Sequence, residues 1–268
     1  MNVATDQTGR LDILGCPVDL IGVDDAVAWV RSALGATNGE CRHLVTLNPE
    51  YVMMARRDRE FRDAVRNADL VTADGIGVVL AARWLWPGAS LERITGIDLI
   101  EMLARLEHGG AFFLGGAPGN AAEAALRLGR RYPGFVPAGI WDGGSANASD
   151  DPESLKRVLQ SGARVVLVAY GAPGQVLWIT RNQEALARQG VRLAIGVGGA
   201  FDVLAGAIPR APRWMRRCGL EWLYRLVREP WRWRRQRVLP LFALHMLLSG
   251  IVRRVRRLLH DAGNGVVF

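Results

Sequence analysis

The stretch Ala111-Phe112-Phe113-Leu114-Gly115-Gly116-Ala117-Pro118-Gly119 decides the fold. An apolar run of strand length leads directly into a glycine turn, and helical sequence follows from Asn120 to Arg131. Two later strands, Val165–Tyr170 and Leu193–Val197, also run into glycine turns, so the order of strand, glycine turn and helix is repeated. Repetition of this unit predicts an α/β protein, in which a parallel sheet carries helices on both faces.

Towards the N-terminus, the sequence predicts further strands and the helices between them. A short strand pair is expected within Leu11–Leu20, followed by a helix capped by Asp24. Two more strands are expected at His43–Leu47 and Asp69–Thr72. Ligands of open parallel sheets bind at the carboxyl ends of the strands, so the turns that follow the strands should share one rim.

The last quarter of the chain has a different composition. Between Arg210 and Arg257 there are fourteen arginines, no lysine and two acids, a charge of +12, whereas the whole chain carries +8 and the remaining residues therefore carry −4. Tryptophans are interleaved with these arginines. We therefore expect two parts, a core at residues 1–209 and a basic helical appendage at residues 210–268. Such a basic segment suits a polyanionic partner, either nucleic acid or an anionic membrane surface.

Within this appendage, Val238–Val252 is an apolar run of fifteen residues with arginines on both sides. A membrane-spanning helix needs about 17–25 apolar residues, so the run indicates a segment that lies in the membrane interface. If the preceding sequence is one helix, Arg225, Arg228, Arg232 and Arg235 fall along one face of it, three to four residues apart. Arginine side chains suit the oxygens of a diphosphate.

Several kinds of site are not indicated by the sequence. Phe201 stands where the third glycine of a dinucleotide-binding pattern would be, and no phosphate-loop Gly-Lys-Ser/Thr motif is present. The three cysteines are far apart and the four histidines are scattered, which argues against a zinc site and a disulfide framework. The N-terminal sequence has no signal-peptide pattern. We expect no cofactor and no metal.

Candidate catalytic residues follow two of the predicted strands. Asp74 comes after a strand and before Gly75, so its carboxylate either caps the next helix or acts as a general base towards an acceptor hydroxyl. Thr46 and Asn48 are two residues apart and so share one face. They either form a turn or hydrogen-bond to sugar hydroxyls or an N-acetyl group.

Candidate binding residues lie at the same predicted rim. Arg93 is either a surface residue or a bidentate partner of a diphosphate. Gln175 opens a helix, whose backbone N–H groups favour a phosphate. Asp202 either caps a helix or accepts a hydrogen bond from a ribose or a uracil. Gly115 and Gly116 form a turn that a phosphate could approach closely.

In this order, these motifs resemble the WecG/TagA/CpsF glycosyltransferases over roughly residues 44–235. The most specific part of the resemblance is the run from Arg210 to Leu226, followed by Glu229-Pro230 and Arg232. The other matching strings are Thr46-Leu47-Asn48-Pro49, Ala73-Asp74-Gly75-Ile76-Gly77-Val78, Arg93-Ile94-Thr95-Gly96-Ile97-Asp98-Leu99, Phe113-Leu114-Gly115-Gly116, Tyr132-Pro133-Gly134 and Gly198-Gly199-Ala200-Phe201-Asp202.

The resemblance implies an inverting, metal-independent transferase with a Rossmann-like core and a membrane-binding C-terminal appendage. Known members transfer N-acetylmannosamine, its uronic acid or glucose from a UDP-sugar to a lipid diphosphate-linked sugar. By the family pattern, Asp74 is the proposed base, Thr46 and Asn48 line the sugar site, and Gln175 matches the family glutamine. Arg225, Arg228 and Arg232 would meet the polyprenyl diphosphate. The expected location is the cytoplasmic face of the membrane, as a peripheral protein in cell-surface polysaccharide synthesis, and a homo-oligomer is compatible with this.

The sequence departs from the family pattern at two positions near Gln175. Gly174 and Val176 stand where the family usually has lysine and glutamate. Two other readings therefore stay open: a catalytically impaired, UDP-binding relative that acts as a membrane-bound partner, and a nucleic-acid-binding protein that uses its basic tail. The apolar run Val238–Val252 suits a bilayer and has no purpose on nucleic acid, so we expect no nucleic-acid partner.

Overall fold

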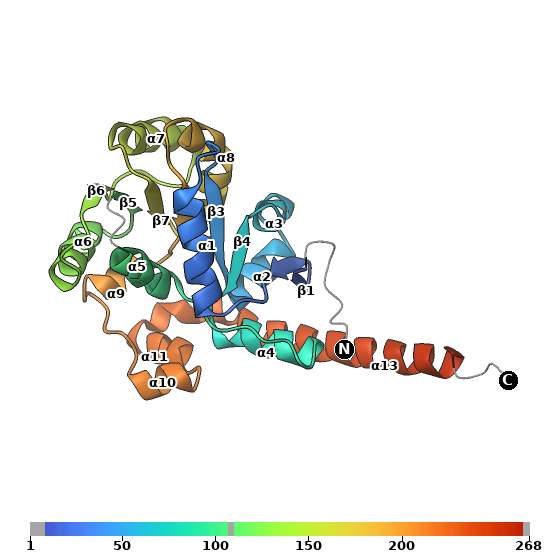
Figure 1. The fold of residues 1–268 in the computed structure, drawn as a ribbon. Helices are drawn as coiled ribbons and strands as arrows, with labels where there is room; N and C mark the ends of the chain where they lie inside the picture. Colours follow the sequence, from blue (N-terminus) through green and yellow to red (C-terminus); the bar gives the residue numbers. More distant parts are fainter. Residues whose placement is uncertain (1–8, 107–109, 265–268) are drawn as a thin grey trace.

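The computed structural model describes residues 9–106 and 110–264 and contains a six-stranded sheet in the order β4-β3-β8-β7-β5-β6 (Figure 1). All neighbouring strands in it are parallel. The strands are β3 (Arg42–Leu47), β4 (Leu70–Ala73), β5 (Ala111–Gly115), β6 (Pro137–Trp141), β7 (Val165–Ala169) and β8 (Leu193–Gly196). The α/β architecture with a parallel, Rossmann-like sheet is confirmed.

Helices cover both faces of the sheet, and three apolar clusters fill the space between them. The central strands are apolar at nearly every position because both of their faces are buried. One face packs against α1 (Val23–Gly35), α5 (Gly96–Arg105), α6 (Asn120–Arg131) and α9 (Ala200–Leu204). The other packs against α2 (Pro49–Ala55), α3 (Arg59–Arg66), α7 (Asp151–Gln160) and α8 (Gly174–Arg188). A hairpin of β1 (Leu11–Ile13) and β2 (Cys16–Val18) packs beside α3.

The N-terminal cap of α1 differs from the prediction. Gly22 is the N-cap residue, and its backbone N–H donates to the carboxylate of Asp25 at 2.9 Å. Asp24 lies in the first turn of the helix. A carboxylate at the third helical position reaches back to the N-cap more easily than one at the second position, so the cap belongs to Asp25.

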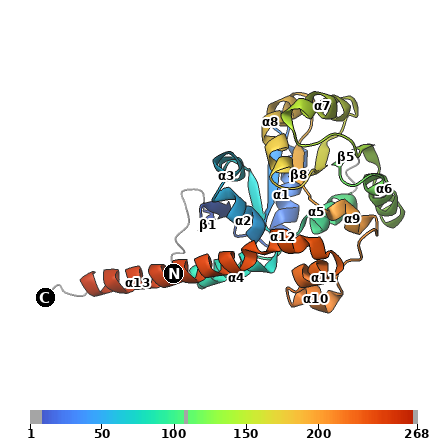
Figure 2. The same ribbon diagram turned by 180° about the vertical axis from the view of Figure 1, so that it is seen from behind.

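The C-terminal part of the chain crosses the carboxyl end of the sheet and then leaves the core (Figures 1 and 2). Its helices are α10 (Arg213–Arg217), α11 (Glu221–Arg228), α12 (Trp233–Gln236) and α13 (Val238–Asn264), and a 3-10 turn at Pro230–Arg232 lies between α11 and α12. A second 3-10 turn, at Ala148–Asp150, precedes α7 in the core. The condition that would place Arg225, Arg228, Arg232 and Arg235 along one face, a single helix, is not met. Helix α11 ends before Pro230, which lacks the N–H that a continuing helix needs.

The last helix, α13, begins where the apolar run begins and continues beyond it. Its first half packs against α2 and against α4 (Ile76–Leu85), and its second half projects from the core (Figures 1 and 2). By length and composition, the segment Pro230–Arg256 is long and apolar enough to cross a membrane, and 17% of its most apolar window is buried. The helix is therefore an apolar element with little cover from the rest of the protein.

Candidate active site

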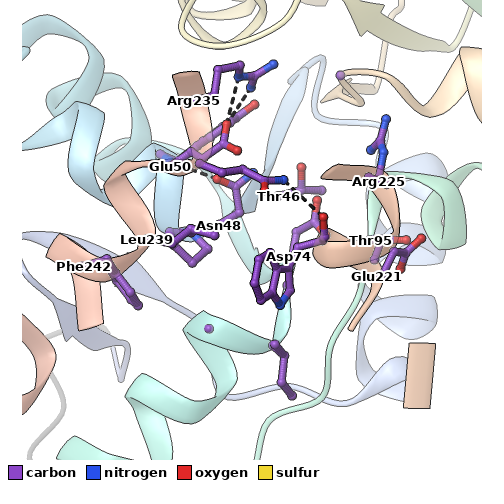
Figure 3. Close-up of a pocket in the computed structure, with 18 of the residues that line it drawn as sticks. Thr46, Asn48, Glu50, Asp74, Thr95, Glu221, Arg225, Arg235, Leu239 and Phe242 are labelled. Atoms are coloured by element: carbon purple, nitrogen blue, oxygen red, sulfur yellow. Dashed lines mark hydrogen bonds and ion pairs between the residues drawn. The ribbon is translucent and has the colours of Figure 1, made fainter. Parts of the chain in front are cut away.

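A cavity of about 1000 Å³ opens at the carboxyl ends of β3, β4 and β8 (Figure 3). Strand β3 lies between β4 and β8 in the sheet, so the chain connections run in opposite directions from this point. This topological switch point is where ligands of open α/β sheets bind. Loops of the core form one side of the cavity, and α11 to α13 form the other.

Thr46 and Asn48 both line this cavity, as their spacing predicts. The hydroxyl of buried Thr46 donates to the carbonyl of Gly196 at 3.3 Å, which ties the end of β3 to the end of β8. Asn48 is also the N-cap of α2, since its side-chain oxygen accepts from the backbone N–H of Tyr51 at 3.0 Å. The cap fixes the direction of the Asn48 side chain, so its amide group is held at the cavity.

Asp74 follows β4 and lines the cavity between these residues and the appendage (Figure 3). Its backbone N–H donates to the carbonyl of Leu47 at 2.7 Å, which continues the pairing of β4 with β3. The N-cap of α4 is Gly75, with a φ of +105°, and no side chain caps that helix. The Asp74 carboxylate is therefore not used as a helix cap and is free for chemistry.

The surroundings of Asp74 raise its pKa to about 7. Burial is the main cause, because it disfavours the charged carboxylate. Arg93 and Arg225 lower the pKa, whereas Glu221 and Asp98 raise it. A carboxylate with a pKa near neutrality can accept a proton during a reaction and release it afterwards.

Arg93 lies beside Asp74, where residues 73 and 93 form an isolated parallel bridge. Its guanidinium forms an ion pair with Glu221 of α11, with 3.0 Å between Nη1 and Oε2. The structure thus places Arg93 at the cavity and joins it to the appendage. Glu221 was not among the predicted site residues, although it is one of two acids in the basic segment.

The second acid of that segment, Glu229, is also a counter-ion. It is buried, and its Oε2 lies 3.4 Å from Nε of Arg225 and 2.8 Å from Nε of Arg232. Both arginines line the cavity beside Gly199, where an added Cβ would lie 3.2 Å from Arg225 Nη2. Nη2 of Arg225 is buried without a hydrogen-bond acceptor among the described residues, which suits a bound anion.

Arg228 lies elsewhere. It is exposed and does not line the cavity, and its guanidinium lies 5.6 Å from the centre of the Tyr224 ring. Arg235, four residues before Leu239, does line the cavity and pairs with Glu50 at 2.8 Å (Figure 3). Of the four arginines predicted to act together, the break at Pro230 therefore brings three to the cavity.

Gln175 is almost fully buried, and every polar group of its side chain has protein partners. Its Oε1 accepts from the backbone N–H groups of Gly171 at 3.1 Å and Gly198 at 3.0 Å, and its Nε2 donates to the Tyr51 hydroxyl at 2.7 Å. The side chain thus joins the loops after β7 and β8 to α2. Tyr51 was not predicted from the sequence, and no local pattern marks it.

Gly115, Gly116 and Asp202 lie on a neighbouring part of the rim and do not line the cavity. Gly115 has a φ of +81°, and a Cβ there would lie 2.6 Å from the Tyr170 ring. Asp202 accepts from the side-chain amide of Asn120 at 2.7 Å. The glycine turn is therefore required by close packing.

The two departures from the family pattern have a structural explanation. A Cβ at Gly174 would lie 2.2 Å from the Cβ of Ala146, so a lysine does not fit while this loop keeps its position. Val176 is buried in an apolar cluster, where a glutamate would lose its hydration. Both replacements are thus accommodated by packing next to Gln175.

Within residues 9–106 and 110–264, no group of three His, Cys, Asp or Glu side chains is placed to hold a metal ion. The expectation that neither metal nor cofactor takes part stays a prediction. The cationic groups at the cavity are arginines, whose fixed positive charge can stabilise a diphosphate.

Taken together, a Rossmann-like sheet, a carboxylate with a pKa near 7 and several arginines at the switch point form a site that suits an anionic ligand and proton transfer. The chain belongs to the glycosyl transferase WecG/TagA/CpsF family, whose model matches residues 11–256. It is a glycosyltransferase, as the sequence predicted.

Two characterised relatives carry the same name, N-acetylglucosaminyldiphosphoundecaprenol N-acetyl-beta-D-mannosaminyltransferase. The protein of Bacillus subtilis (strain 168) is 35% identical over 205 residues, which is 75% of this chain and 77% of the relative. The protein of Bacillus spizizenii (strain ATCC 23059 / NRRL B-14472 / W23) is 35% identical over 208 residues, 76% of this chain and 78% of the relative. The similarity thus extends over most of both proteins.

Proposed function

We propose that this glycosyltransferase transfers N-acetylmannosamine, its uronic acid or glucose from a UDP-sugar to a saccharide linked to a polyprenyl diphosphate. The names of the two relatives support an N-acetylmannosaminyl donor and an undecaprenyl diphosphate-linked acceptor. The single observation that carries the proposal is the Asp74 carboxylate, with its pKa of about 7, in a cavity that also holds Arg93, Arg225 and Arg232.

The proposed reaction is a single displacement at the anomeric carbon. The oxygen of the acceptor hydroxyl attacks the anomeric carbon. At the same time the bond between this carbon and the UDP oxygen breaks, so the configuration at the carbon inverts. Asp74 takes the proton of the hydroxyl, and the electron pair of the broken bond leaves with UDP. Thr46 and Asn48 line the same cavity as the base and can position the sugar. The arginines of the cavity can stabilise both the charge that develops on the leaving UDP and the diphosphate of the acceptor, which meet in this one cavity.

The nucleoside end of the donor is assigned to the neighbouring rim. Gly115 and Gly116 lie there at the carboxyl end of β5, and Asp202 lies in the first turn of α9, which follows β8. Both glycines have positive φ values and no Cβ of their own, so no side chain of residues 115 and 116 shields their backbone N–H groups. This placement extends the donor from the rim towards Asp74.

A direct assay tests the function. Purified protein is incubated with UDP-N-acetylmannosamine and a synthetic N-acetylglucosamine diphosphate linked to a prenyl chain, with and without EDTA. We expect the transfer product, with inverted anomeric configuration, at equal rates in both conditions. A retained configuration, or a rate that EDTA abolishes, contradicts the proposed mechanism, and transfer from no UDP-sugar contradicts the function.

We further propose that the protein acts at the cytoplasmic face of the membrane. Support comes from the exposed Trp231 and Trp233, and from exposed leucines along α13 such as Leu244 and Leu248. Tryptophan suits the headgroup layer, where its ring is apolar and its N–H is polar. The arginines Arg253–Arg257 that follow suit anionic lipid.

A further inference from the structure

The cavity continues from Asp74 into a groove between α4 and α13. Helix α4 starts two residues after Asp74, and α13 starts two residues after Gln236, which also lines the cavity. The two helices lie side by side in both ribbon views as they leave the sheet (Figures 1 and 2). Because a helix rises 1.5 Å per residue, the wall from Ile76 to Trp84 is about 12 Å long.

The part of the cavity wall on these two helices is apolar. On both α4 and α13, none of the described residues that line the cavity is charged. These residues are Ile76, Gly77, Leu80, Ala81 and Trp84 on α4, and Leu239, Pro240, Phe242, Ala243, Met246 and Leu247 on α13. The one polar side-chain group among them, the Trp84 N–H, donates to the carbonyl of Met246 at 3.1 Å. The groove therefore offers a ligand no hydrogen-bonding side chain.

The groove is recessed, with a floor and two walls. Phe242 and Met246 are each 5% exposed and form the floor with Ala81, whereas Leu80 is 55% exposed and Leu247 is 51% exposed on the walls. Gly250 permits the close approach of the helices, since a Cβ there would lie 2.0 Å from Trp84 Nε1. A flat bilayer surface would meet the walls and leave the floor uncovered, so the groove fits a slender apolar chain.

The opposite end of the same cavity indicates what that chain is attached to. There the lining changes to Asp74, Arg93, Arg225 and Arg232. A ligand that fills the whole cavity has a diphosphate at one end and a hydrocarbon chain at the other. We propose that the groove between α4 and α13 binds the isoprenoid units next to the diphosphate of the acceptor, so that the enzyme recognises the lipid directly. This inference rests on the proposed function and adds the lipid-binding residues.

Binding of two soluble probes with the same charged group tests the groove without any catalysis. Farnesyl diphosphate and methyl diphosphate are titrated into the full chain by calorimetry, below the micelle concentration of the former. We expect farnesyl diphosphate to bind at least about tenfold more tightly, because burial of only two CH₂ groups contributes about that factor. Equal affinities for the two probes would overturn the inference.

Two neighbouring residues of α13 supply a matched pair of variants. Ala243 and Leu244 are both exposed, but only Ala243 lines the groove. Ala243→Phe should remove most of the advantage of farnesyl diphosphate and leave the affinity for UDP and methyl diphosphate unchanged. Leu244→Phe should leave all three affinities unchanged. If both variants lose the same affinity for farnesyl diphosphate, the probe binds unspecifically to the helix surface, and the proposal that the groove binds the lipid is wrong.

A second variant covers the case in which Ala243→Phe does not fold. Leu80→Gln changes the opposite wall at a half-exposed position, where the fold tolerates a polar side chain, and should also weaken farnesyl diphosphate alone. Transfer to prenyl-linked and methyl-linked acceptors separates the two proposals. Transfer without any chain-length preference leaves the function and removes the groove, whereas selective farnesyl binding without transfer leaves the groove and removes the function.

Discussion

Asp74 shows how the chain keeps a carboxylate available for proton transfer. Gly75 takes the N-cap position of α4, with a positive φ that glycine adopts without strain, so the Asp74 side chain is not used as a cap. The carboxylate is left between the end of the sheet and α11, where burial outweighs the nearby arginines. The same burial that makes Asp74 a suitable base also makes its charged form costly to the fold.

The first prediction concerns the rate. Asp74→Asn keeps the shape of the side chain and removes the proton acceptor, so kcat should fall by about 10²–10⁴-fold. In the wild type, kcat/KM should rise with pH through about 7, where Asp74 loses its proton. UDP affinity, measured by calorimetry, serves as the control and should not change. A variant with nearly wild-type kcat would exclude Asp74 as the base.

The second prediction concerns stability. Because the folded-state pKa of about 7 lies above the unfolded value, the folded protein binds the extra proton between about pH 4 and pH 7. The ionised Asp74 therefore destabilises the fold progressively as pH rises through this range, and fully above pH 7. Asp74→Asn should be more stable than wild type by about 1–3 kcal/mol at pH 8, and equally stable near pH 4. Urea unfolding at both pH values measures the difference, and an equal difference at both would contradict the assigned pKa.

At the scale of elements, the site depends on side chains that join loops. Gln175 holds the turns after β7 and β8 against α2, and Glu221 holds α11 against Arg93. Each joins segments far apart in the sequence. The cavity therefore keeps its shape through a small number of buried polar contacts.

The third prediction tests Gln175. Gln175→Leu has a similar volume and leaves the N–H groups of Gly171 and Gly198 and the Tyr51 hydroxyl without their partner, which should cost about 2–4 kcal/mol of unfolding free energy. KM for the donor should rise as the loops move. Gln183→Leu, on the same helix, removes a hydrogen bond to the carbonyl of Cys41 and is the control. Its loss of stability should be smaller and its KM normal; the same KM in both variants would contradict the positioning role.

The fourth prediction tests the contact between appendage and core. A double-mutant cycle on unfolding free energy with Arg93→Ala and Glu221→Ala should give a coupling of about 1 kcal/mol, because both side chains are largely buried. The exposed pair Arg188 and Glu184 on α8 is the control, with an expected coupling of about 0.3 kcal/mol. Additive effects of the first pair would show that the appendage does not depend on this contact.

Features that depend on residues close together in the sequence were predicted, whereas contacts between residues far apart in the sequence were not. The helix from Asn120 to Arg131 was predicted with its correct ends because the glycine turn before it is a local signal. The end of β3, which carries Thr46, was placed correctly because Asn48-Pro49 is a local turn signal. The strand before Asp74 was predicted at Asp69–Thr72 and lies at Leu70–Ala73. The pairing of Arg93 with Glu221 joins residues 128 positions apart, and it depends on how α11 packs, which no local pattern encodes.

The cap of α1 and the break after α11 show a second reason why the structure differs from the sequence predictions. Asp24 and Asp25 are adjacent acids, and the choice between them depends on the backbone geometry of Gly22. Pro230 was visible in the sequence, yet the regular spacing of the arginines favoured a continuous helix. In the structure the break turns Arg232 back towards Glu229 and the cavity. The spacing therefore pointed to arginines at the site, but Pro230 determines which of these arginines reach the cavity.

At the scale of the whole molecule, the active site is shared between two parts of the chain. The predicted division at residue 209 stays a prediction, but residues after it supply one side of the cavity, including Glu221, Arg225 and Phe242. The same segment continues into α13, which projects from the core (Figure 2). This helix carries exposed apolar side chains. Completion of the site and the proposed membrane binding thus involve one continuous segment.

The last prediction separates these two roles by two truncations. Removal of residues after Gly250 keeps Phe242 and Met246, which pack against the core, and removes the arginines Arg253–Arg257. At about 1 kcal/mol per arginine, affinity for anionic vesicles in a sedimentation assay should fall about a hundredfold or more, while transfer to a methyl-linked acceptor in solution persists. Removal of residues after Ala211 deletes one side of the cavity and should abolish both. For the intact protein, high salt should weaken vesicle binding because the charges are screened. Full vesicle binding after the shorter truncation would assign membrane association to residues before 251, because the shortened protein keeps the exposed Trp231 and Trp233 and the exposed leucines of the first half of α13.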